Sequence, residues 1–316
     1  MNAPAPGSPT GLPWLPLAAV ATTLVLWASA FVAIRYLHED FSPGALTLGR
    51  LVVASVCLAV VALLSARRSL RRPTGREWAG MAVIGVLWFA LYSVALNEGE
   101  SRVDAGTASM LIQVSPVLIS VLAAIFLGER FTRWLGLGLA VAFAGVVVIS
   151  LSTSDAADRD STGVLLCLVA AVAYSISLVV QKPLVARLPA IQVTWLAATI
   201  GCVVSLPFAP QLVREVAAAP PSSTFWMVYM GALPTALAFT TYAYALRHLS
   251  ASTLGVTTYL VPPLTIVMGW LLLAETPPAL AYAGGALALV GVALTRRGGR
   301  ARAARARREE PVSAQT

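Results

Sequence analysis

The sequence predicts an all-α polytopic membrane protein, with ten transmembrane helices arranged as two inverted five-helix repeats. Of its 316 residues, 58% are hydrophobic and 11% are charged, with a mean hydropathy of +0.79; a soluble domain carries about 25% charged residues. Several apolar runs reach the roughly 20 residues that a helix needs to cross a bilayer. The runs are continuous rather than alternating, and backbone groups in lipid must pair internally, so we expect helices rather than a barrel.

Ten apolar runs bounded by charge, proline or glycine define the expected spans. They cover residues 15–36, 43–65, 78–97, 104–127, 132–151, 162–184, 190–211, 223–246, 251–273 and 278–296. We expect a tail (1–14), a first five-helix repeat (15–151), an extracytoplasmic linker (152–161), a second repeat (162–296) and a basic tail (297–316).

The basic residues of the short connections predict the orientation. Seventeen of the 22 Lys and Arg residues fall on one side of the alternating spans, four fall on the other, and Arg50 lies within a span. Because cytoplasmic loops carry the excess of Lys and Arg, we expect both termini to lie in the cytoplasm. We expect the protein itself to lie in the cytoplasmic membrane. The arginine-rich tail is better explained as a cytoplasmic anchor than as a nucleic-acid site, so no nucleic-acid partner is expected.

A repeat at a fixed offset predicts the internal symmetry. A shift of 146 residues carries Pro116 onto Pro262, Glu129 onto Glu275 and Gly145 onto Gly291. Since each half has five spans, an odd number, the second half begins on the opposite side of the membrane and is inverted. Inverted repeats are a recurring plan of transporters, with the substrate site near the membrane midplane where the repeats meet.

These motifs resemble the drug/metabolite transporter superfamily, specifically EamA-type proteins with two tandem EamA domains. The resemblance rests on "LWASAFVAIR" in the first span, on the proline and arginine of Pro43 to Arg50, and on "SP" followed by "LGERF" in the fourth span. It covers residues 15–296 and implies a carrier of amino acids, related metabolites or amphipathic drugs. Leu196 stands where Arg50 would recur in the second half, so any role of Arg50 is not shared between the halves.

Polar and aromatic residues inside the spans are the candidate substrate-binding residues. Helical spacing places several of them on common faces, and such residues avoid lipid in favour of protein or water. Together they predict a cavity with aromatic walls and hydroxyl and amide groups, suited to a small amphipathic solute. The candidates are Trp27, Trp88, Tyr92, Ser109, Gln113, Tyr174, Ser177, Tyr242 and Tyr259, with Arg50. For the serines in particular, hydrogen bonding between helices is the competing explanation.

Three intramembrane prolines are the candidate gate or kink residues. Pro116 and Pro262 lie near the centres of the fourth and ninth spans, and Pro263 follows the second of them. A proline frees the carbonyl four residues back, here those of Ile112 and Thr258. These carbonyls could bind a substrate ammonium, but a kink that shapes the cavity or hinges a gate is the favoured interpretation.

Arg50 lies roughly 10 Å inside its span at 1.5 Å per residue. It has two interpretations: it attracts a substrate carboxylate, or it pairs with an outer acid such as Glu98. No Asp or Glu lies at the centre of a span, which favours facilitated diffusion or exchange over a proton-coupled antiporter, the main alternative.

Other function classes are less consistent with the sequence. No nucleophile–base set or metal-ligand cluster converges from the spans, so we expect no enzyme, no cofactor and no metal site. A non-transporting membrane scaffold is a weaker alternative. Small residues in the fifth and tenth spans allow close helix approach, either within the monomer or in a homodimer. We expect a metabolite exporter or exchanger that works by alternating access, with a small-molecule substrate and the lipid bilayer as its partners.

Overall fold

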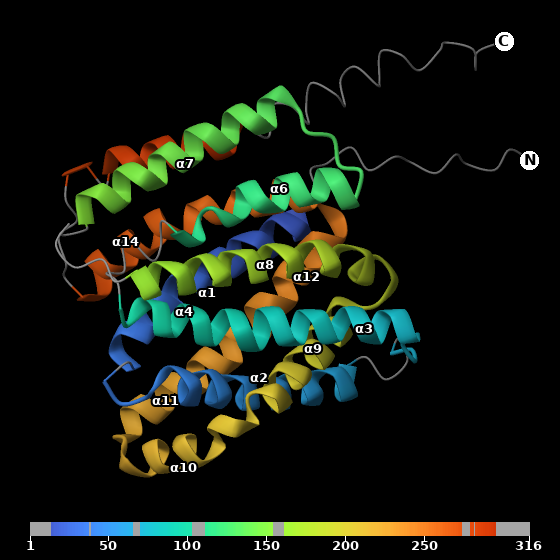
Figure 1. The fold of residues 1–316 in the computed structure, drawn as a ribbon, viewed down its shortest axis with the longest axis vertical. Coiled ribbons are helices and arrows are strands. Elements are labelled where there is room, and N and C mark those ends of the chain that lie inside the picture. The colour runs from blue at the N-terminus through green and yellow to red at the C-terminus, as the bar shows by residue number, and fades with distance from the viewer. Residues whose placement is uncertain are drawn as a thin grey trace, which may run out of the picture.

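A computed structural model of the chain describes residues 14–37, 39–65, 70–102, 111–153, 161–273, 279–280 and 282–294, and the regular structure of these ranges is helical. The first half contains α1 (Trp14–Leu37), α2 (Pro43–Ser65), α3 (Gly75–Ile84), η1 (Gly85–Tyr92), α4 (Ser93–Glu100), α6 (Ser115–Phe126) and α7 (Arg133–Thr153). The second half contains α8 (Ser161–Arg187), α9 (Ala190–Val204), η2 (Leu206–Phe208), α10 (Ala209–Ala218), α11 (Pro221–Met230), η3 (Gly231–Leu237), α12 (Ala238–His248), α13 (Ala251–Thr257), η4 (Thr258–Leu260) and α14 (Val261–Leu273). A final helix covers Tyr282–Leu294. Most helices run side by side in one bundle (Figure 1).

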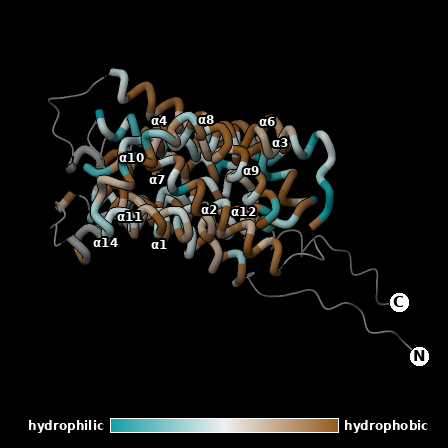
Figure 2. Tube along the Cα trace, turned by 90° about the horizontal axis from the view of Figure 1, so that it is seen from below, coloured by the Kyte–Doolittle hydropathy of each residue, from teal (hydrophilic) through white to brown (hydrophobic). Residues whose placement is uncertain are grey.

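The described helices include several that can cross a membrane. Four are long and apolar enough by themselves: Trp14–Ile34, Pro43–Leu64, Gly75–Glu100 and Ser161–Arg187. The pair Ala190–Val204 and Leu206–Ala218, bent by 52°, makes a fifth if it counts as one span. Apolar residues dominate the length of the bundle and hydrophilic residues gather toward its ends, as a membrane-embedded bundle requires (Figure 2). The chain is therefore an all-helical, multi-pass protein.

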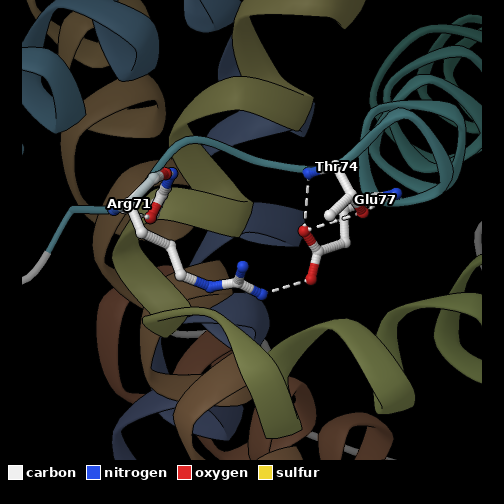
Figure 3. Close-up of polar contacts among 4 residues, drawn as sticks. Arg71, Thr74 and Glu77 are labelled. Carbon is white, nitrogen blue, oxygen red and sulfur yellow. Dashed lines mark hydrogen bonds and ion pairs between the residues drawn. The ribbon is translucent and has the colours of Figure 1, made fainter.

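The N-terminus of α3 is fixed by a capping box. The Thr74 amide donates to Glu77 Oε2 at 2.8 Å, and the Glu77 amide donates to Thr74 Oγ1 at 3.4 Å. Arg71 adds an ion pair to the same carboxylate (Figure 3). Because the first amides of a helix have no partner within the helix, this reciprocal pair defines where α3 begins.

Two helical segments change their regular structure just before a proline. Residues 111–112 are helical and residues 113–114 form a turn before α6, and the 3₁₀ segment η4 lies between α13 and α14. Pro116 and Pro262 are each the second residue of the helix that follows. Proline is tolerated in the first turn of a helix because the amide it lacks has no partner there. The prolines therefore lie where the helical structure changes, and their role as gate or kink residues stays a prediction.

The helix α7 packs closely on the final helix, Tyr282–Leu294, at one edge of the bundle (Figure 1). A Cβ atom added at Gly145 would lie 2.5 Å from the Ala288 amide nitrogen, and one at Gly291 would lie 2.3 Å from the Ala142 amide nitrogen. Backbone therefore meets backbone, which only small residues permit. At these four positions the small residues mediate packing within the chain, one of the two explanations that the sequence left open.

Candidate functional site

A cavity lies among α1, α2, η1, α4, α8, η3 and α12, beside the segments before α6 and α14. It offers about 90 Å³ to the centres of water-sized spheres, room for several waters, since one water needs about 10–15 Å³ on this measure. Its lining residues are Trp27, Ala30, Phe31, Ile34, Arg50, Trp88, Tyr92, Leu96, Ile112, Gln113, Tyr174, Pro234, Thr235, Phe239, Thr258 and Val261. It thus contains both aromatic walls and a few polar groups, as small-molecule sites do.

Interlocked aromatic rings form one wall of the cavity. The Trp27 ring lies 5.5 Å from Phe239 and 4.8 Å from Tyr242 between centroids, and Trp88 lies 5.0 Å from Tyr174. The Tyr174 and Tyr242 hydroxyls are hydrogen-bonded at 2.7 Å. Rings at these separations attract one another beyond the burial of their surface, so the wall is preorganised.

Both carbonyls freed by the prolines have side-chain partners. Gln113 Nε2 donates to the Thr258 carbonyl at 3.3 Å, and Ser115 Oγ donates to the Ile112 carbonyl at 2.6 Å. The Gln113 bond joins the break before α6 to the break before α14, at the cavity wall. Backbone groups at membrane depth are thereby satisfied without a bound solute.

Arg50 projects from the first third of α2 into the cavity lining and is 8% exposed. Its Nη2 donates to Ser93 Oγ at 2.7 Å, while its Nε has no acceptor. The prediction that Arg50 pairs with Glu98 is wrong, because the Glu98 carboxylate accepts a hydrogen bond from Arg102 Nε at 2.9 Å instead. Within the described part of the chain, Glu100 is the acid that interacts electrostatically with Arg50, and the sequence reasoning missed it.

The structure brings six of the expected residues together around the cavity: Trp27, Arg50, Trp88, Tyr92, Gln113 and Tyr174. Tyr242 belongs to the same cluster of aromatic rings but does not itself line the cavity, and Ser177 is fully buried one turn beyond Tyr174 on α8. Tyr259 packs in a separate cluster against α7, while Pro116, Pro262 and Pro263 lie in the first turns of α6 and α14. Ser109 lies outside the described residues.

The second half contributes lining residues that the sequence reasoning missed. Thr235 and Phe239 line the cavity, and Tyr242 follows Phe239 by three residues. The spacing 235, 239, 242 places all three on one helix face, a signal that was present in the sequence.

The two ends of the bundle differ. The cavity lies toward the end where α1 finishes and α2 begins, which we name the cavity end. At the opposite end, the closed end, Glu129 accepts hydrogen bonds from the Ala251 and Ser252 amides at 2.6 and 3.0 Å. Lys182 there donates to the Leu246 and Leu249 carbonyls. These contacts join α6 to α13 and α8 to α12.

Between the cavity and the closed end, α8 carries buried polar atoms without partners. Ser177 and Gln181 are both 0% exposed. Neither Ser177 Oγ nor the amide atoms of Gln181 have a hydrogen-bond partner. Such atoms are costly in an apolar interior, since nearly all buried polar groups in proteins are paired.

A wider groove of about 670 Å³ runs along α3, α6 and α8 near the closed end. Its walls are apolar, with Val180, Leu184 and Phe126 among them, and its charged groups are Arg76, Glu77 and Arg187. A surface of this kind at the end of a membrane span suits lipid chains better than a polar solute. The cavity lined by Arg50 and Gln113 is therefore the stronger candidate site.

Comparisons with known proteins are consistent with this geometry. The profile of the EamA-like transporter family matches residues 14–151 and 161–297. A "Probable terminal-alkyne amino-acid exporter" of Streptantibioticus cattleyicolor is 41% identical over 279 residues, which cover 88% of this chain and 92% of that protein. The "Uncharacterized transporter YdfC" of Bacillus subtilis is 33% identical over 272 residues, covering 85% and 87%.

Two more distant likenesses extend the comparison. The "Pseudopaline exporter CntI" of Pseudomonas aeruginosa is 28% identical over 228 residues, covering 70% of this chain and 76% of that protein. A crystal structure with 21% identity superimposes with a TM-score of 0.72, covering 90% of this chain and 97% of the other, and establishes likeness of fold alone. From the family match over both halves, we conclude that the chain belongs to the EamA-like transporter family and is a multi-pass membrane transporter of small molecules.

Proposed function

We propose that the protein exports or exchanges small organic metabolites by alternating access, through ten membrane spans arranged as two inverted five-helix repeats. The observation that carries this proposal is the cavity beside the segments before α6 and α14, with Gln113 of one segment bonded to the Thr258 carbonyl of the other. Discontinuous helices meeting near the midplane are where transporters of inverted-repeat design bind their substrates.

The inverted repeat is supported by features that recur at an offset of 146 residues. The π-helical segments begin at Gly85 and Gly231, and α6 and α14 begin at Ser115 and Val261. The glycine contacts are reciprocal as well, because Gly145 meets Ala288 while Gly291 meets Ala142. Reciprocal contacts of this kind are the signature of a two-fold axis.

Alternating access is supported by the difference between the two ends. The described lining residues lie toward the cavity end, while Glu129 and Lys182 hold helices together at the closed end. In the alternative conformation these contacts would open, and Ser177 and Gln181 would gain water as partners. The excess of Arg in the connections at the closed end supports a cytoplasmic location for this end. On this assignment the conformation described is outward-facing and both termini are cytoplasmic.

The relatives narrow the class of solute. One is named as an exporter of amino acids and another as an exporter of pseudopaline. Together with the aromatic wall, these names favour export of amino acids or related amphipathic metabolites.

The proposal is tested in proteoliposomes by exchange of radiolabelled amino acids. Gln113→Leu removes the bond between the segments before α6 and α14 and should lower the exchange rate while the protein remains folded. Thr199→Val is the matched control, since Thr199 bonds only to the Trp195 carbonyl of its own helix and does not line the cavity. Unchanged exchange by a folded Gln113→Leu protein would contradict this role for the contact.

A proton-coupled antiporter is the second candidate, because Glu100 interacts electrostatically with the cavity residue Arg50. An imposed pH gradient would then drive uphill transport of the solute. Glu100→Gln would abolish this proton-driven transport while leaving downhill exchange. Uphill transport driven by the pH gradient would support the proton-coupled antiporter. Its absence would support facilitated diffusion or exchange.

A further inference from the structure

We propose that Arg50 and Trp27 together form a carboxylate-binding subsite, and that the transported solutes carry a carboxylate as their essential polar group. The inference rests on the proposed function and narrows its substrate class. The geometry behind it is two hydrogen-bond donors without acceptors in the lining of one cavity.

The guanidinium of Arg50 has more donors than partners. It carries five N–H groups, and Ser93 Oγ accepts one of them at 2.7 Å. Its Nε is buried and has no acceptor, although the side chain is only 8% exposed. Buried charges in proteins are normally paired as well as hydrogen-bonded, so this group is incomplete without a further acceptor.

Trp27 provides the second incomplete group. Its indole Nε1 is buried and has no acceptor, and the ring lines the same cavity as Arg50. Both groups can only donate. A ligand that satisfies both must supply acceptor atoms, and one that also balances the guanidinium must be negative.

The described part of the lining supplies no such anion. None of the described residues that line the cavity is acidic. Within the described part of the chain, no carboxylate oxygen lies within ion-pair distance of Arg50, because the recorded ion pairs there are Arg71–Glu77 and Arg102–Glu98. Glu100 acts on Arg50 from farther away, which offsets part of the burial cost but leaves Nε without an acceptor.

The backbone carbonyls near the prolines, unlike Arg50 and Trp27, already have hydrogen-bond partners. The proline-freed carbonyls of Ile112 and Thr258 already accept hydrogen bonds from Ser115 and Gln113. An ammonium group is therefore an optional feature of the solute, whereas a carboxylate completes two unpaired donors. The rings of Trp88 and Phe239 are left to contact the apolar remainder of the solute.

The test uses matched sets of probes with phenyl, aliphatic and terminal-alkyne side chains. Each set contains the amino acid, its amide, the amine without a carboxylate and the carboxylic acid without an amine. Exchange is measured in proteoliposomes with the full-length protein, and binding is measured by thermal stabilisation of the purified protein. We expect the wild type to bind and exchange the amino acids and the carboxylic acids, and to discriminate against the amides and amines.

Variants separate binding of the carboxylate from general damage. Arg50→Gln should weaken carboxylate binding at least tenfold, which corresponds to about 1.4 kcal/mol, and should change binding of amides and amines less than twofold. Trp27→Phe keeps an aromatic ring but removes the N–H donor, so it should weaken binding of carboxylates several-fold and change binding of amides little. Arg102→Gln is the charge-matched control, because Arg102 pairs with Glu98 outside the cavity. If Arg50→Gln does not fold, Arg50→Lys and Trp27→Phe carry the same comparison.

The outcomes distinguish this inference from the proposed function. Equal exchange of amides and carboxylates by the wild type overturns the carboxylate subsite while leaving the transporter intact. Retention of the carboxylate preference by folded Arg50 and Trp27 variants overturns it as well. Failure of every probe class to bind or exchange overturns both the proposed function and the inference.

Discussion

The contact of Glu129 with the start of α13 gives a quantitative test of alternating access. Its carboxylate accepts from the Ala251 amide at 2.6 Å, from the Ser252 amide at 3.0 Å and from Ser252 Oγ at 2.6 Å. Gly128, with φ of 64°, ends α6 in the left-handed region and turns the chain toward this contact. If the contact exists only while the closed end is shut, its loss must shift the balance between the two conformations.

The magnitude follows from the hydrogen bonds. Glu129→Gln retains one acceptor oxygen, so at least one donor of the first turn of α13 loses its partner, at a cost of about 1–3 kcal/mol. Loss of the charge at a helix N-terminus adds about 0.3–1 kcal/mol. With Glu129 half-buried, we take a total of about 2 kcal/mol, which changes the population ratio roughly 30-fold at 1.4 kcal/mol per factor of ten.

The assay is cysteine labelling in nanodiscs by a water-soluble maleimide. Ser177→Cys, on a background in which Cys57, Cys167 and Cys202 are replaced, introduces a thiol at a fully buried position between the cavity and the closed end. Adding Glu129→Gln should raise the labelling rate about 10- to 30-fold, in proportion to the open population.

Glu98→Gln is the control for this experiment, since it removes an exposed carboxylate paired with Arg102 at the cavity end. Exposed pairs of this kind contribute about 0–1 kcal/mol, so labelling should change little. A labelling rate in folded Glu129→Gln equal to that of the parent would refute the reasoning, because the contact would then persist in both conformations.

Three further predictions concern packing and buried polar groups, each followed by thermal unfolding of the purified protein. Gly145→Ala should cost about 1–3 kcal/mol through overpacking against the Ala288 backbone, whereas Gly75→Ala, with open space around its Cβ, should cost far less; equal losses would argue against the close contact. Tyr174→Phe and Tyr242→Phe should show a coupling energy of about 1 kcal/mol in a double-mutant cycle, and additive effects would mean that their hydroxyls do not interact. Gln181→Leu should raise the unfolding temperature by removing about 1–3 kcal/mol of unsatisfied polar burial and should slow exchange; a lower unfolding temperature would show that the amide has a partner.

The sequence predicted the helical architecture because its signals are local. Apolar runs bounded by charge, proline or glycine each act over a few residues, and the described helices fall within or close to these runs. The prolines were predicted as gate or kink residues, and they lie in the first turns of α6 and α14. The turn at residues 113–114 carries a hydrogen bond from Gln113 to the Thr258 carbonyl, a contact between distant parts of the chain that no local pattern predicts.

The candidate cavity was predicted in part for the same reason. Trp27, Trp88 and Gln113 stand out because polar or aromatic groups inside a span have few alternative locations. Tyr259 has the same properties but packs against α7, a choice set by the rotation of its helix that spacing alone leaves open. The contacts of Glu129 and the electrostatic interaction of Arg50 with Glu100 join residues distant in sequence or select one of two nearby acids, and no local pattern encodes either.

In the transport cycle that we propose, Arg50, the one arginine among the described lining residues, would break the symmetry between the two halves. Two identical halves assembled around a two-fold axis would present Arg50 twice, whereas this chain carries Leu196 at the corresponding position of its second half. A solute with one negative group then has one preferred way to enter, with that group against α2 and its apolar body against the rings. Fusing the halves into one chain frees each half to differ from the other, and an arginine present in one half alone would let a nearly symmetric frame recognise an asymmetric molecule.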